Sequence, residues 1–122
     1  MAQNNRRGKT MSNITSLSEY QVYSDKGYGV TSESIEYLET LKGKLGSIRQ
    51  INIDQNREMS MEIVCEGGLV LLSGCNCGYG GTGPHGSVKV LELLGFNNPK
   101  RYEEQIFGEE SVRIEVREEV RY

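Results

Sequence analysis

Length, composition and charge already limit the classes of function open to this chain. Its 122 residues suffice for one domain whose hydrophobic core needs neither metal nor disulfides. The formal net charge of -3 and a pI of about 5.3 argue against a nucleic acid polymer as partner, because proteins bind such polymers largely by neutralising their phosphates. A small anionic ligand is not excluded, because it needs only a few local donors.

The first residues are polar and carry a small basic cluster. We predict a flexible arm over residues 1–17 and a single folded domain over 18–122. The start of the chain lacks the apolar core of a signal peptide, and no run approaches the roughly 18 apolar residues of a membrane span. We therefore expect a cytoplasmic protein with no membrane partner, whose cysteines are free thiols.

The first regular elements are a strand and a helix. Tyr20–Tyr23 fits a short strand or hairpin, and the segment 32–45 fits a helix that Gly46 ends. The helix is predicted because four apolar residues recur at helical spacing, namely Ile35, Leu38, Leu41 and Leu45.

Three strands with short connections follow the first helix. Apolar residues alternate along 47–54 and 58–65, which predicts strands with one buried face. The continuous apolar run at 69–73 predicts a strand buried on both faces. The short connections indicate an antiparallel meander.

A glycine-rich loop, GCNCGYGGTGPHG at 74–86, leads into a second helix expected over 84–94. Pro84 suits the first helical position, because the N–H group that proline lacks would be unpaired there. Gly95 can take the left-handed cap conformation, after which Phe96 can pack back onto the last turn.

The C-terminal part adds one more strand. Residues 100–108 fit either a helical turn or an extended connection, and residues 111–122 alternate between apolar and charged side chains, which predicts a half-buried strand. Together these elements predict an α+β fold: one small domain with an antiparallel sheet and two main helices.

The glycine-rich loop is the main candidate for function. A strand, a glycine-rich loop and a helix N-terminus together form an arrangement that binds anions, because the first amides of the helix lack internal acceptors. The loop matches GxGxxG at Gly78, Gly80 and Gly83, but this is weak evidence in so glycine-dense a segment. A purely structural connection is the alternative.

The candidate ligand-binding residues belong to the loop and to the last strand. In the loop and the start of the helix they are Cys77, Gly78, Tyr79, Gly80, Gly81, Thr82, Gly83, His85, Gly86 and Ser87. On the last strand, Arg113 and Arg117 could clamp phosphates together with Lys100 or Arg101. The alternative for these arginines is a solvated strand face that nearby glutamates balance.

Three cysteines and the single histidine lie within one short stretch. Cys65, Cys75, Cys77 and His85 offer zinc-ligand chemistry, but their spacing does not match a zinc knuckle, and Cys65 is in phase with buried residues. Cys75 or Cys77 could be a reactive thiol, because a nearby helix N-terminus lowers a thiol pKa. We predict no metal and no cofactor.

The loop CGYGGTGPHG running into SVKVLELLGF, in an acidic chain of this size, resembles the phage anti-Thoeris proteins. That resemblance implies a non-catalytic sponge that sequesters cyclic ADP-ribose-type immune signals and so counteracts bacterial anti-phage defence. It also implies a homo-oligomer with ligand pockets near subunit interfaces, acting in the host cytoplasm. Some members of the family also bind cyclic oligonucleotides.

The residues by themselves also favour a binding protein over an enzyme, because they offer one histidine and no recognisable catalytic set. Two alternatives stay open. One is a small nucleotide phosphodiesterase or hydrolase that uses His85. The other is a structural or partner-binding protein with no small ligand.

Overall fold

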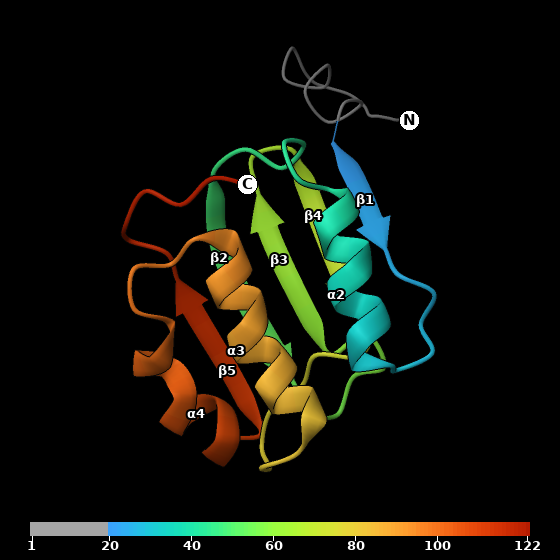
Figure 1. Cartoon of the computed structure of the whole chain (residues 1–122), viewed down its shortest axis with the longest axis vertical. Helices are drawn as coiled ribbons and strands as arrows, with labels where there is room; N and C mark the ends of the chain where they lie inside the picture. Colours follow the sequence, from blue (N-terminus) through green and yellow to red (C-terminus); the bar gives the residue numbers. More distant parts are fainter. Residues whose placement is uncertain (1–19) are drawn as a thin grey trace, which may run out of the picture.

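A five-stranded sheet carries its main helices on one face in the computed structural model, which describes residues 20–122 (Figure 1). The arm predicted at residues 1–17 lies outside the described residues. In chain order the elements are β1 (Gln21–Ser24), α2 (Thr31–Thr40), β2 (Ile48–Asp54), β3 (Met61–Cys65), β4 (Gly68–Leu72), α3 (Thr82–Leu94), the 3-10 helix η1 (Pro99–Tyr102), α4 (Glu103–Gly108) and β5 (Ser111–Glu115). The predicted α+β class is confirmed.

The sheet has the strand order β1-β4-β3-β2-β5. The predicted meander is confirmed, since β2, β3 and β4 pair antiparallel in succession. The strand β5 pairs with the other edge of β2, and this pair is also antiparallel. The strand β1 differs from the expectation of an antiparallel sheet, because it pairs with β4 in parallel. It forms no hairpin: α2 follows β1 and carries the chain back along the sheet before β2 begins.

The hydrophobic core lies between the sheet and the helices. Val70 and Leu72 of β4 are fully buried, whereas Leu69 and Leu71 are only partly buried on the other face. The prediction that this strand is buried on both faces was therefore wrong. Helices cover only one face of the sheet, so even a continuous apolar run alternates between buried and partly exposed side chains.

Both main helices are present, but each has a boundary that differs from the prediction. The helix α2 ends at Thr40 and is followed by a turn in which Gly43 has a φ of 85°, while Leu41 and Leu45 are still buried. The helix α3 begins at Thr82, which makes Pro84 its third residue. Proline is tolerated there because the first amides of a helix have no internal acceptor.

The end of α3 follows the prediction. Gly95 takes the left-handed conformation, with a φ of 97°. Its amide donates to the carbonyl of Glu92 at 3.1 Å, and the amide of Phe96 donates to that of Leu91 at 3.1 Å. Phe96 is buried, so the expected C-terminal cap and its apolar contact are confirmed.

The C-terminal part is more helical than predicted and its strand is shorter. Residues 99–108 form η1 and α4, and the strand β5 ends at Glu115 instead of continuing to the end of the chain. The expected alternation is confirmed within β5, where Val112 and Ile114 are buried beside exposed Arg113. Beyond it, Arg121 forms an isolated bridge with Ser47.

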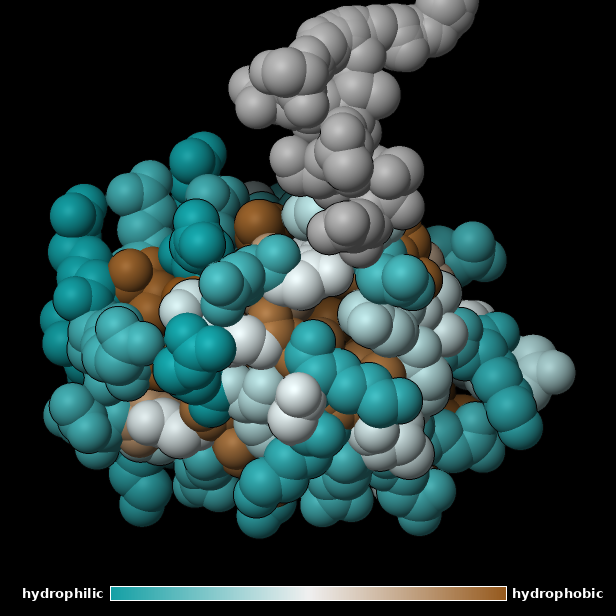
Figure 2. Space-filling view, turned by 90° about the horizontal axis from the view of Figure 1, so that it is seen from above, coloured by the Kyte–Doolittle hydropathy of each residue, from teal (hydrophilic) through white to brown (hydrophobic). Residues whose placement is uncertain are grey.

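The surface is predominantly polar at the end of the molecule where β1 begins. Figure 2 shows hydrophilic side chains over most of this end, with apolar side chains visible between them. Within residues 20–122, no helix has both the length and the apolar character needed to cross a membrane.

Candidate functional site

Two helices begin at the same end of the sheet. The strands β1 and β4 are neighbours and run parallel, and each is followed by a helix, α2 and α3 respectively. The N-termini of both helices therefore lie beside the carboxyl ends of these two strands (Figure 1). The carboxyl end of neighbouring parallel strands is the place where many α/β proteins bind ligands.

The start of α2 is hydrogen-bonded to the loop before α3 and lies close to Gly86 near the start of α3. The hydroxyl of Thr31, the first residue of α2, donates to the carbonyl of Gly74 at 2.6 Å. On the other side, a Cβ atom placed on Gly86 of α3 would collide with the methyl group of Thr31. A glycine at position 86 therefore lets α3 approach α2 closely at their N-terminal ends.

A pocket of about 310 Å³ opens between these helix ends. It is lined by Gly29, Thr31, Ser73, Gly74, Asn76, Tyr79, Thr82 and Gly83, none of which is charged. The N-cap residues, Val30 and Gly81, make no side-chain cap hydrogen bond. The first-turn amides of both helices are thus not capped by side chains, and they carry the positive ends of two helix dipoles.

Hydrogen bonds hold the loop around this pocket in place. The amide of Asn76 donates to the carbonyl of Gly83 at 3.1 Å, which closes the loop on itself. Ser87 is fully buried, and its hydroxyl donates to the carbonyl of Asn76 at 2.6 Å. The loop is therefore fixed from the side of α3 before any ligand binds.

Of the predicted site residues, Tyr79, Thr82 and Gly83 line this pocket. Gly86 and Ser87 are buried behind it, where they set the approach of the helices and the loop conformation. Gly81 is the N-cap of α3, and Gly80 is an exposed part of the loop with open space around it.

Cys77 and Gly78 belong to the other side of the loop. Cys77 is fully buried, and its Sγ lies 3.4 Å from the carbonyl oxygen of Glu110. The amide of Gly78 donates to the carbonyl of Ile106 at 2.8 Å. Both residues thus connect the loop to the segment around α4, and neither lines the pocket.

His85 is exposed on the outer side of α3. Its Nδ1 lies 2.9 Å from the carbonyl oxygen of Gly81, and its ring centroid lies 4.8 Å from that of Phe107 on α4. It does not line the pocket between the helix ends.

Arg113 and Arg117 are not brought together with the loop. They line a separate hollow of about 500 Å³ beside α4, which Arg101 also lines. Each arginine lies 3.4 Å from a carboxylate oxygen of Glu115. The hollow and the pocket between the helix ends share no lining residue, so these guanidinium groups and the helix ends belong to different sites.

The three cysteines are free and buried. Burial raises the pKa of a thiol, which acts against the predicted reactivity of Cys75 or Cys77. Burial, and after it the charge of Asp25, raises the pKa of Cys75 to about 12. Burial likewise raises the pKa of Cys77 and of Cys65. Removal from water thus acts against the lowering of the thiol pKa that was expected from the nearby helix end. The described residues contain no group of three potential metal ligands.

Several residues of the pocket were not identified from the sequence. Gly29 and Ser73 lie in the two connections that follow β1 and β4. They meet because these strands are paired, and no local pattern indicates a parallel pair between segments so distant in the chain.

Comparisons with protein-family models, with curated proteins and with solved structures found no match to this chain.

Proposed function

We propose that this protein binds and sequesters, without cleaving it, a small phosphate-bearing ligand of the nucleotide type. A cyclic ADP-ribose isomer that serves as a bacterial immune signal is the ligand we propose first, and its removal would counteract anti-phage defence. The observation that carries the proposal is the convergence of two helix N-termini, neither with a side-chain cap, on one uncharged polar pocket.

The chemistry of the pocket suits a phosphate group. Backbone amides at helix N-termini donate hydrogen bonds to phosphate oxygens, and the two helix dipoles add favourable charge. Thr82 and Tyr79 supply hydroxyl groups that can donate to the ligand, whereas the hydroxyl of Thr31 already donates to the carbonyl of Gly74. No carboxylate lines the pocket to repel an anion.

The same lining supports binding without cleavage. It contains no histidine, cysteine or carboxylate, the groups that most often serve as general bases or nucleophiles. The alternative is a hydrolase that uses His85, which is exposed on another side of α3. Analysis of the reaction products would reveal such cleavage.

We further propose a homo-oligomer. A pocket of about 310 Å³ is at the lower limit for small-molecule sites, so part of a whole nucleotide would project from it. A second subunit would cover whatever part of the ligand stays exposed to solvent. Light scattering is expected to give at least twice the chain mass of 13.7 kDa at micromolar concentration. A particle of about 14 kDa that still binds the nucleotide would contradict this proposal.

The test of the binding site compares two glycines of the same loop. A Cβ atom on Gly83 would lie 2.6 Å from the hydroxyl oxygen of Tyr79 and 3.0 Å from Cβ of Asn76, two residues that line the pocket. The same atom on Gly80 would meet nothing within 4 Å. Gly83→Val is therefore expected to weaken binding of cyclic ADP-ribose at least about tenfold in titration calorimetry, whereas Gly80→Ala changes it less than about twofold.

Thermal melts of both variants control for misfolding of the loop. The bound nucleotide is then released by denaturing the complex and is identified by mass spectrometry. Intact nucleotide supports sequestration, and a cleaved product favours the hydrolase. If the parent protein binds no nucleotide, the structural or partner-binding alternative replaces the proposal.

A further inference from the structure

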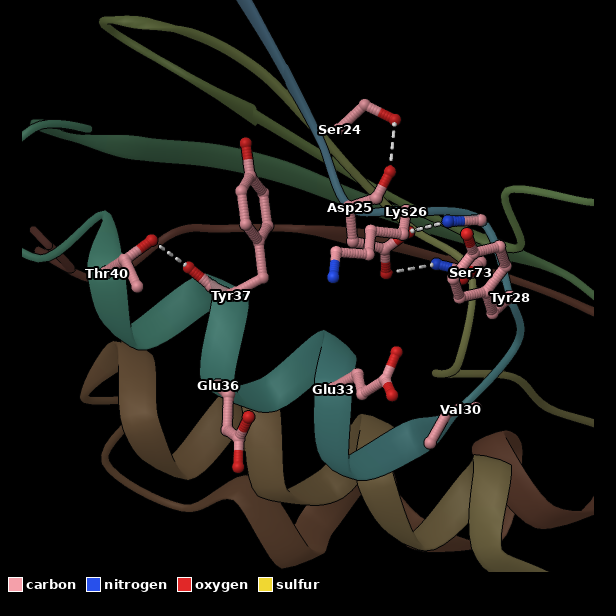
Figure 3. Close-up of a pocket in the computed structure, with 11 residues that line it drawn as sticks. Ser24, Asp25, Lys26, Tyr28, Val30, Glu33, Glu36, Tyr37, Thr40 and Ser73 are labelled. Atoms are coloured by element: carbon pink, nitrogen blue, oxygen red, sulfur yellow. Dashed lines mark hydrogen bonds between the residues drawn. The ribbon is translucent and has the colours of Figure 1, made fainter.

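A second pocket, larger than the one between the helix ends, lies beside α2. The two pockets are separated by the segment between β1 and α2, residues 25–30. The larger pocket has a volume of about 460 Å³. Tyr37 and Glu33 project from α2 toward this segment, whereas Glu36 points away from it (Figure 3). Ser73 lines both pockets, so the two hollows share a wall.

Hydrogen bonds fix the segment between the pockets at both ends. The carboxylate of Asp25 accepts from the amide of Gly27 and from the amide of Ser73, each at 2.9 Å. The amide of Gly29 donates to the hydroxyl of Ser73 at 3.0 Å. The segment is thus bound to the connection that follows β4.

Tyr28 lies in the middle of this segment. It lies between two glycines in the left-handed region, Gly27 with a φ of 79° and Gly29 with a φ of 73°. The residue is 73% exposed, although it lines the pocket. An aromatic ring that is exposed while its backbone is fixed on both sides is suited to stack on a planar ligand.

We propose that this second pocket holds the base and ribose of the nucleotide whose phosphate lies at the helix N-termini, with the base stacked on Tyr28. The inference rests on the proposed function and extends it to a two-part site. The Glu33 carboxylate can accept hydrogen bonds from ribose hydroxyls or from an exocyclic amino group of the base.

The charges of the two pockets set the orientation of the nucleotide. The carboxylates of Asp25 and Glu33 and the ammonium group of Lys26 line the larger pocket, a balance of charge that disfavours a phosphate there. The smaller pocket has no charged lining residue and receives two helix N-termini. A nucleotide is therefore held with its phosphate in the smaller pocket and its nucleoside part in the larger one.

The experiment titrates AMP and ribose 5-phosphate, which differ by the base, into the parent protein and three variants. The parent is expected to bind AMP more tightly than ribose 5-phosphate. Tyr28→Ala should weaken AMP binding at least about fivefold and change ribose 5-phosphate binding less than twofold. Tyr28→Phe keeps the ring and should bind AMP as the parent does. Tyr20→Ala, at an exposed tyrosine outside both pockets, serves as the matched control.

The outcomes separate this inference from the proposed function. If Tyr28→Ala binds AMP as tightly as the parent, or if the parent binds both compounds equally, the two-part site is overturned while phosphate binding stands. If the parent binds neither compound nor cyclic ADP-ribose, both proposals fail. Equal melting temperatures of the variants would show that lost AMP binding reflects the missing ring.

Discussion

Replacement of Asp25 by alanine is expected to lower the free energy of unfolding by roughly 2–4 kcal/mol, because it removes a charged acceptor that three donors share. The carboxylate accepts from the hydroxyl of Ser34 at 2.5 Å and from the amides of Ser73 and Gly27. Urea unfolding of the parent and the variant measures the difference.

The size of this effect follows from what the carboxylate connects. Ser34 is fully buried in α2, and its hydroxyl also accepts from the amide of Gly74 at 2.8 Å. Asp25 and Ser34 thus join the end of β1, the first turns of α2 and the connection after β4. Loss of the carboxylate leaves the hydroxyl of buried Ser34 and two partly buried amides without this acceptor, which costs more than the mean value of a hydrogen bond.

The same carboxylate makes stability depend on pH. Burial raises the pKa of Asp25, but the hydrogen bonds from Ser34, Ser73 and Gly27 lower it more, so the folded-state pKa lies below the ordinary value of 3.8. The unfolded chain therefore takes up this proton more readily than the folded one. The stabilisation is complete above the unfolded pKa and is lost as the pH falls through the folded pKa.

Urea unfolding between pH 7 and pH 3 tests this dependence. Asp25→Asn is expected to be less stable than the parent at pH 7 and to lose less stability on acidification. Glu36→Gln, an exposed carboxylate of α2 that points away from the segment, should follow the parent at both pH values (Figure 3). Equal acid sensitivity of Asp25→Asn and the parent would contradict the role given to this carboxylate.

Gly86→Ala is expected to destabilise the protein by about 1–3 kcal/mol, although alanine is the better helix former by about 1 kcal/mol. The added Cβ atom would collide with the methyl group of Thr31, the first residue of α2, which lies close to the start of α3. Relief of that collision would separate the two helices at the ends that form the smaller pocket.

A second substitution tests whether this collision is the cause. Thr31→Ser removes the methyl group and keeps the hydroxyl that donates to the carbonyl of Gly74. In the Thr31→Ser background, Gly86→Ala should be neutral or stabilising. Gly108→Ala, at an exposed helical glycine with nothing within 4 Å of the added Cβ, should not destabilise either background. A cost of Gly86→Ala that is equal in both backgrounds would disprove the proposed helix contact.

Local patterns in the sequence determined the kinds of elements and most of the core. The alternation in β2, β3 and β5 and the helical spacing in α3 depend on which side chains face the core, and such periods are visible in the sequence. The cap at Gly95 was also predictable, because a left-handed residue after a helix favours glycine. The order of the strands and the parallel pairing of β1 with β4 were not predictable, since neither follows from a local period.

The candidate site divides in the same way. A glycine-rich loop before a helix pointed to Tyr79, Thr82 and Gly83, which line the smaller pocket. Only the tertiary structure placed the start of α2 beside the start of α3 and brought Asp25 to Ser73. It also placed Arg113 on the edge strand β5, beside a hollow that no residue of the loop lines. The physical reason is that these distances depend on strand pairing between remote segments, which is decided by packing of the whole core and not by any neighbouring residues.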